Sequence, residues 1–132
     1  MRDVPILYVP RARAYLVRID EDVAVRARRS LTPTEVAGAN VGFLALHQKC
    51  PHLGCKLPHC ASSGWFECPC HASQFNVTGE RMAGPAPSGM SRFAVVVAGG
   101  RVGVDVATVL PGVPIGTSLG RPDARGPHCI GN

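Results

Sequence analysis

Two short boxes of cysteine and histidine constrain this chain more than any other feature of its sequence. The first box, residues 50–55, reads C-P-H-L-G-C, and the second, residues 68–73, reads C-P-C-H-A-S. Each box carries a cysteine close to a histidine, so the pair offers thiolate and imidazole donors together. The boxes therefore describe a mixed sulfur and nitrogen metal site that two loops of the fold must build at one place.

The spacing of the donors, C-x-H followed by C-x-x-H, indicates which metal centre to expect. Cys50 and Cys68 are the candidate thiolate ligands of one iron of a [2Fe–2S] cluster, and His52 and His71 are the candidate imidazole ligands of the other. Because two neutral imidazoles replace thiolates, we expect a one-electron centre with a reduction potential of roughly −150 to +300 mV. A structural zinc site is the alternative, although its common ligand spacing is C-x-x-C.

Four cysteines lie outside this donor set. Cys55 and Cys70 belong to the two boxes, and we expect a disulfide between them that clamps the loops and indicates an oxidising compartment; two unpaired small side chains are the alternative. Cys60 and Cys129 are expected to pair as well, with two free thiols as the alternative, and this bond would close a loop of about seventy residues worth roughly 4 kcal/mol in the chain-entropy model. The other histidines are expected in loops or at the surface rather than at the metal: His47, His59 and His128.

Composition favours short strands and loops over long helices. The 132 residues include 15 glycines and 12 prolines, which interrupt almost every apolar run. Valine-rich, partly alternating segments predict antiparallel strands at Val4–Val9, Ala14–Ile19, Val23–Ala27 and Val41–His47. Arg92–Ala98 and Arg101–Val106 flank Gly99-Gly100, which predicts a tight hairpin, and Thr34–Ala37 is expected to form one helical turn.

The length of the chain fits one domain, residues 1–132, in three parts. Base strands are expected from residues 1–46 and 91–110, a loop-rich insert from 47–90 holds the chemistry, and residues 111–132 form an extended surface tail. The net charge of +5 does not predict nucleic-acid binding, because no helix-turn-helix pattern or row of aromatic residues accompanies the arginines. No apolar run approaches the length of about eighteen residues that spans a bilayer, so any membrane association would need a missing N-terminal anchor or a partner subunit.

The boxes resemble those of Rieske iron–sulfur proteins from the cytochrome bc and b6f quinol-oxidising complexes. The extra box cysteines support this subclass, because Rieske ferredoxins and the Rieske domains of ring-hydroxylating oxygenases usually lack them. Gly84-Pro85-Ala86-Pro87 resembles the family's proline loop, which packs over the cluster. The resemblance covers residues 41 to 106 well and implies an all-β fold, an antiparallel β-sandwich with an inserted cluster-binding subdomain.

The resemblance also implies roles for single residues. Leu53 would cover the cluster and help form a docking surface at the quinol pocket, and Ser73 would donate its hydroxyl to a bridging sulfide. Phe75 stands where high-potential members have a tyrosine that bonds to a ligand sulfur, so we expect a lower potential that suits a quinol such as menaquinol. Ala72 replaces the usual glycine and adds a methyl group in a tight loop.

The function implied by the resemblance is electron transfer coupled to proton transfer. His52 and His71 would take an electron and a proton from quinol at the exposed tip, and the electron would pass to a c-type cytochrome haem. The expected partners are cytochrome b and a c-type cytochrome, at the periplasmic or outer face of the bacterial cytoplasmic membrane, and catalysis would belong to that assembled complex. The main alternative is the Rieske small subunit of a molybdenum oxidase such as arsenite oxidase; a soluble ferredoxin that feeds an oxygenase is the second.

Overall fold

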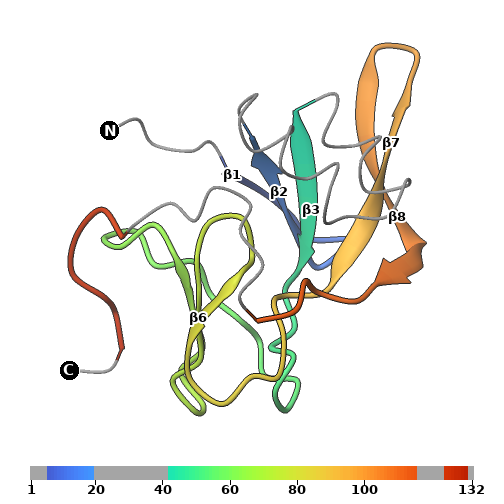
Figure 1. Ribbon diagram of the computed structural model, residues 1–132. Helices are drawn as coiled ribbons and strands as arrows, with labels where there is room; N and C mark the ends of the chain where they lie inside the picture. The colour runs from blue at the N-terminus through green and yellow to red at the C-terminus, as the bar shows by residue number, and fades with distance from the viewer. Residues whose placement is uncertain (1–5, 20–41, 116–123, 131–132) are drawn as a thin grey trace.

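Two antiparallel sheets make up the computed structural model, which describes residues 6–19, 42–115 and 124–130. The larger sheet has the strand order β1-β2-β3-β7-β8, with bounds Ile6–Val9, Ala14–Arg18, Phe43–His47, Arg92–Ala98 and Arg101–Leu110. The smaller sheet contains β4 (Phe66–Glu67), β5 (Gln74–Phe75) and β6 (Arg81–Ala83). Figure 1 shows the small sheet and its long green and yellow loops beside the large sheet. Within the described ranges, no helix is long and apolar enough to cross a bilayer.

The strands predicted from the apolar pattern are confirmed wherever the structure describes them. The predicted segments match β1, β2, β3 and β7 closely, while Val23–Ala27 and Thr34–Ala37 lie outside the described residues. The Gly99-Gly100 hairpin is also confirmed, because both glycines have the positive φ angles, 57° and 75°, that such a turn requires. Strand β8 continues to Leu110, beyond the predicted Val106, because residues 106–108 of β8 bulge out between the pairs Ala94–Asp105 and Phe93–Val109, and pairing then resumes as far as Leu110.

The main core lies between the two sheets. Alternate residues of β2 and β3 point to the same side of the large sheet: Tyr15, Val17, Leu44 and Leu46. They pack in one buried cluster with Phe66 of β4 and Phe75 of β5. The Tyr15 and Phe66 rings lie 4.7 Å apart between centroids, and Phe66 pairs directly with Phe75 across β4 and β5. Because each fully buried aromatic side chain contributes about 1.5–3 kcal/mol, this cluster joins the insert firmly to the base sheet.

The insert and the tail differ from the sequence-based expectation in detail. Strands β4, β5 and β6 lie in what was expected to be a loop-rich insert, and at two or three residues each they are too short to show a period. The segment expected to begin a surface tail instead enters the core, where Val113 is 4% exposed and Pro114 bridges Ser88. Gly112 permits this approach, since a Cβ there would lie 1.9 Å from the carbonyl oxygen of Gly89.

Candidate metal centre

The two boxes fold into loops with the same backbone hydrogen bonds. In the first, the Cys50 N–H donates to the Cys55 carbonyl at 2.8 Å, and the Gly54 N–H donates to the Cys50 carbonyl at 2.9 Å. The second repeats both bonds, from Cys68 to Ser73 at 2.8 Å and from Ala72 to Cys68 at 3.1 Å. Each loop therefore starts at a candidate thiolate ligand and turns back onto it.

The fifth position of each loop has a left-handed backbone. Gly54 has φ of 82° and Ala72 has φ of 64°. A residue with a Cβ pays about 1–2 kcal/mol for this conformation, whereas glycine does not. The departure noted at Ala72 therefore falls on a position whose backbone favours glycine, and because the Ala72 side chain is exposed, the cost is assigned to the backbone conformation.

The candidate thiolate ligands meet inside the protein. Cys50 is 2% exposed and Cys68 is 1% exposed, and neither forms a disulfide. Burial raises the pKa of the Cys50 thiol, and the neighbouring Cys68 side chain raises it further. Two buried thiols brought together from two loops are a suitable pair of ligands, because a bound metal would stabilise both thiolates.

The two candidate histidines lie together at the outer side of the same loops. The rings of His52 and His71 pack edge to face with centroids 4.8 Å apart. His71 is exposed, and Leu53 beside His52 is 68% exposed. The Nδ1 atom of His52 is buried and makes no hydrogen bond in the described part of the chain, which costs free energy unless a metal or another ligand takes that lone pair.

The expected disulfide between the boxes is present. Cys55 and Cys70 are joined with a Cα–Cα distance of 6.6 Å, and the Cys68 sulfur lies within 4.8 Å of both of their sulfurs. The bond links loops that are 15 residues apart in sequence, which in the chain-entropy model is worth about 3 kcal/mol. The clamp is therefore adjacent to a candidate ligand and holds both loops in their relative positions.

Comparison with known proteins identifies this arrangement. The sequence model of the Rieske [2Fe-2S] domain family matches residues 11–98, two thirds of the chain and both boxes. The chain belongs to the Rieske [2Fe-2S] family. Its cofactor is accordingly a Rieske-type [2Fe–2S] cluster, and its residues fit this group, because two free buried thiols and a buried imidazole nitrogen without a partner converge from the two boxes.

The chain is similar in sequence to parts of different kinds of protein. It is 40% identical to the iron–sulfur subunit of the cytochrome b6-f complex of Synechococcus elongatus over 62 residues. This aligned segment makes up 47% of this chain and 35% of that subunit. Over 67 residues it is 37% identical to the carotenoid phi-ring synthase of Chlorobaculum tepidum, 51% of this chain and 10% of that enzyme. The chain thus spans about a third of the length of the b6-f subunits it matches.

A solved structure supports the fold. The crystal structure of the cyanobacterial plasma membrane Rieske protein PetC3 from Synechocystis PCC 6803 superposes with a TM-score of 0.50 at 22% sequence identity. The match covers 78% of this chain and 86% of that protein. The all-β Rieske fold expected from the sequence is therefore confirmed, and the domain is an electron-transfer domain related to the b6-f subunits.

The proline loop of the Rieske domain packs on the second box. Ser73 is completely buried, and its hydroxyl oxygen accepts a hydrogen bond from the Ala86 N–H at 3.1 Å. The hydroxyl proton remains available to donate, as the role expected for Ser73 requires. Gly84 allows the contact, since a Cβ there would lie 2.4 Å from the Ser73 Cα, while Pro85 is exposed.

Phe75 lies in the core on the inner side of the boxes. Its side chain is completely buried in the cluster of apolar residues that also contains Cys50 and Cys68. It pairs with Phe66 across the small sheet. A hydroxyl at this position would therefore enter the same buried region as the two thiols.

Glu67, next to Cys68, is a buried carboxylate that no sequence motif indicated. It accepts hydrogen bonds from the Ser63 hydroxyl, from His128 Nδ1 at 3.0 Å, and from the N–H groups of Cys129 and Ile130 at 2.8 and 3.1 Å. Burial alone raises the pKa of Glu67, but these hydrogen bonds outweigh burial and hold the pKa below its ordinary value. No local pattern predicts this role, because three of the four donors lie more than sixty residues away.

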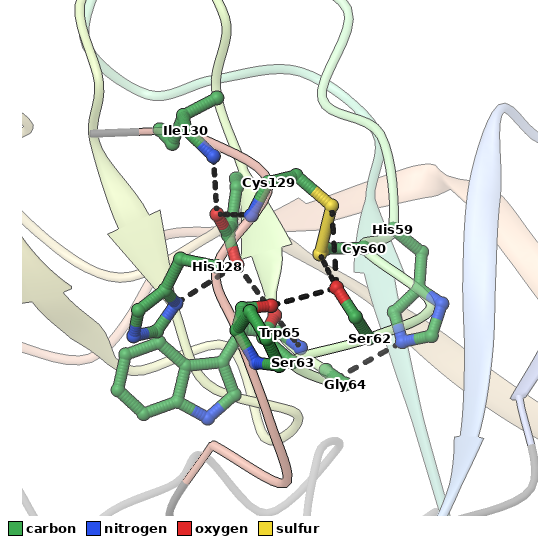
Figure 2. Close-up of polar contacts among 11 residues, drawn as sticks. His59, Cys60, Ser62, Ser63, Gly64, Trp65, His128, Cys129 and Ile130 are labelled. Atoms are coloured by element: carbon green, nitrogen blue, oxygen red, sulfur yellow. Dashed lines mark hydrogen bonds and ion pairs between the residues drawn. A yellow bond between two sulfur atoms is a disulfide. The ribbon is translucent and has the colours of Figure 1, made fainter. Parts of the chain in front are cut away.

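The second expected disulfide fastens the same C-terminal segment. Cys60 and Cys129 are joined with a Cα–Cα distance of 6.0 Å, and the Ser62 hydroxyl lies 3.3 Å from the Cys60 sulfur (Figure 2). The same hydroxyl donates to the Pro127 carbonyl at 2.6 Å. His128 is half-buried against Trp65 rather than at the metal centre. The disulfide and Glu67 thus anchor the tail directly beside the second box.

Proposed function

We propose that this Rieske domain takes an electron and a proton from a quinol and passes the electron to a c-type cytochrome haem within a bc-type complex. The observation that supports this most is the polarity of the centre: both thiols are buried, whereas His71 and Leu53 are exposed at the imidazole side. A redox partner would therefore approach the imidazole ligands. The similarity to cytochrome b6-f iron–sulfur subunits supports the same class of complex.

In this proposal each residue has a definite task. Cys50 and Cys68 hold the inner side of the cluster, His52 and His71 hold the outer side, and the bound cluster supplies a one-electron redox couple. An imidazole nitrogen accepts the quinol proton. Leu53 presents an apolar surface that would exclude water from the contact.

The position of Phe75 supports a potential in the lower part of the Rieske range. A buried phenylalanine offers no hydroxyl to the ligand sulfurs, and hydrogen bonds to the sulfurs of a cluster raise its potential. We propose menaquinol as the quinol for this reason.

We further propose that residues 1–132 form a single domain that works at the periplasmic or outer face of the bacterial cytoplasmic membrane with cytochrome b and a c-type cytochrome. Two disulfides in one small domain support an oxidising compartment. Association with the membrane would use an N-terminal anchor or a partner subunit.

The test is a redox titration of the cluster-loaded protein, monitored by EPR at several values between about pH 6 and pH 10. A rhombic signal is expected, with a midpoint that falls as pH rises, because uptake of an electron by the cluster would be coupled to uptake of a proton. A midpoint independent of pH would contradict proton-coupled transfer by the histidines. Purification of the native complex then distinguishes the partners: b-type and c-type haem spectra support the proposal, and molybdenum in its place supports the oxidase alternative.

A further inference from the structure

An open cleft of about 550 Å³ lies between the turn that joins β1 to β2 and the two ends of the first box. Its polar lining comes from both segments: Tyr8, Arg13, His47, Gln48, Lys49 and Lys56. None of these residues belongs to the candidate cluster ligands. The cleft is therefore a second feature of the molecule, which electron transfer by the cluster does not explain.

Three lining side chains carry a permanent positive charge. Arg13, Lys49 and Lys56 are exposed, and no carboxylate in the described ranges forms an ion pair with any of them. The described carboxylates have other partners: Glu67 binds the C-terminal segment, Glu80 binds Asn76 and Thr78, and Asp105 binds Thr108. The cleft thus concentrates positive charge that no described acidic side chain neutralises.

Two of the cations are held directly opposite each other. Lys49 and Lys56 form an isolated antiparallel bridge across the base of the first box. Like charges at directly opposite positions destabilise a strand pair. The Lys49 stem is also held close to the loop, since a Cβ on Gly54 would lie 3.1 Å from the Lys49 Cε. An anion between the two ammonium groups would turn this unfavourable pair into a binding site.

The remaining polar groups give the cleft a defined wall. Tyr8 donates its hydroxyl to Gln48 Oε1 at 2.6 Å, and Gln48 Nε2 donates to the Tyr15 hydroxyl at 3.1 Å, so Gln48 is held from both sides. Burial lowers the pKa of His47, and the charges of Lys49 and Arg13 lower it further. Arg13, in the turn after β1, and Lys49, beside the first box, therefore both lie close enough to His47 to affect its charge.

We propose that this cleft binds a small polyanion with two or more phosphate or carboxylate groups, held by Arg13, Lys49 and Lys56. The two lysines bracket the first box, so the ligand would contact both ends of the loop that carries Cys50 and His52. This site is separate from the proposed reaction with quinol and does not depend on it.

The experiment is isothermal titration of the cluster-loaded protein with inorganic pyrophosphate and, separately, with citrate. We expect saturable binding at one site that weakens as salt is added. Lys49→Gln, Lys56→Gln and Arg13→Gln should each weaken it by about tenfold, the usual effect of losing one charge-assisted hydrogen bond. The matched control is Arg101→Gln, which removes the same charge at the exposed end of the β7–β8 hairpin and should leave binding unchanged.

Each result decides the proposal. Tighter binding of pyrophosphate assigns the site to phosphate ligands, and tighter binding of citrate assigns it to carboxylates. Equal weakening by Arg101→Gln would show only non-specific attraction to a basic protein and would overturn the site, as would the absence of saturable binding of both probes. Arg13 has a left-handed backbone, with φ of 50°, in its turn, so Arg13→Gln could disturb folding. In that case the two lysine variants carry the test.

Discussion

Ala72 shows how one side chain can work against the loop that contains it. The two boxes share their backbone hydrogen bonds, and each needs a left-handed residue at the fifth position. Gly54 meets this need without cost, whereas Ala72 adopts the same conformation with a Cβ. The strain lies directly between the candidate ligand His71 and the buried Ser73.

We therefore expect Ala72→Gly to stabilise the protein. Relief of about 1–2 kcal/mol of backbone strain is partly offset by the larger unfolded-state entropy of glycine, so the net gain is about 1 kcal/mol or less. Urea unfolding of the cluster-loaded protein measures it. Ala107→Gly is the control, because Ala107 lies exposed in strand β8 with no positive φ and should lose stability instead. A loss of stability in both variants would contradict the interpretation.

A second prediction concerns Phe75. Phe75→Tyr adds a hydroxyl in the buried region that contains Cys50 and Cys68, and a hydrogen bond to a ligand sulfur should raise the midpoint potential. Redox titration measures the change. Phe93→Tyr is the control and should not raise the potential, because Phe93 is buried in a separate apolar cluster that contains neither cysteine. An unchanged midpoint in Phe75→Tyr would remove the argument for a low-potential quinol.

At the scale of elements, the proline loop and the second box depend on one close approach. Gly84 lies where a Cβ would be 2.4 Å from the Ser73 Cα, a separation that backbone atoms cannot tolerate. The loop delivers the Ala86 N–H to the Ser73 hydroxyl only at this distance. The absence of a Cβ at Gly84 therefore allows the proline loop to pack against the second box.

Gly84→Ala should push the proline loop away from the second box. The expected cost is about 1–3 kcal/mol, from the steric contact, a positive φ of 93° and the lost hydrogen bond. Amide hydrogen exchange at Ala86 reports the contact and should become faster. Gly103→Ala is the matched control, since the nearest atom to its Cβ would be 3.9 Å away. Unchanged protection of Ala86 would show that the contact does not hold the loop.

At the scale of the whole molecule, burial of polar residues makes stability depend on pH. Burial lowers the pKa of His59, the Arg125 charge lowers it further, and the hydrogen bond to the Gly64 carbonyl opposes this only in part. The folded protein therefore favours neutral His59, while the unfolded chain takes up a proton near the ordinary histidine value of about 6.5. The unfolded state binds more protons in this window, so the free energy of unfolding falls as pH decreases below that value.

His59→Gln should reduce this pH dependence. Urea unfolding of the cluster-loaded protein at about pH 7.5 and pH 5.5, followed by Trp65 fluorescence, compares the variant with the parent chain. The loss of stability on acidification should be smaller in the variant. The same loss in both proteins would mean that His59 contributes nothing to it.

Features that depend on neighbouring residues could be predicted from the sequence. The spacing of cysteine and histidine predicts the two boxes, and the conformational freedom of glycine predicts the hairpin turn at Gly99-Gly100. Alternating apolar residues predict the strands of the large sheet. Each of these signals lies within a few consecutive residues. Both disulfides were also anticipated, because the six cysteines separate into two ligands and two pairs. The Rieske family could be inferred from these local patterns alone.

Contacts between distant segments, in contrast, became visible only in the folded protein. Glu67 gains its hydrogen bonds from residues near the C-terminus, and the cleft gathers Arg13 with Lys49 and Lys56. Strands β4, β5 and β6 are too short for a periodic signal and exist because they pack on Tyr15 and its neighbours. These features rest on contacts between residues far apart in the chain, and a local pattern carries no information about which distant side chains will be brought together.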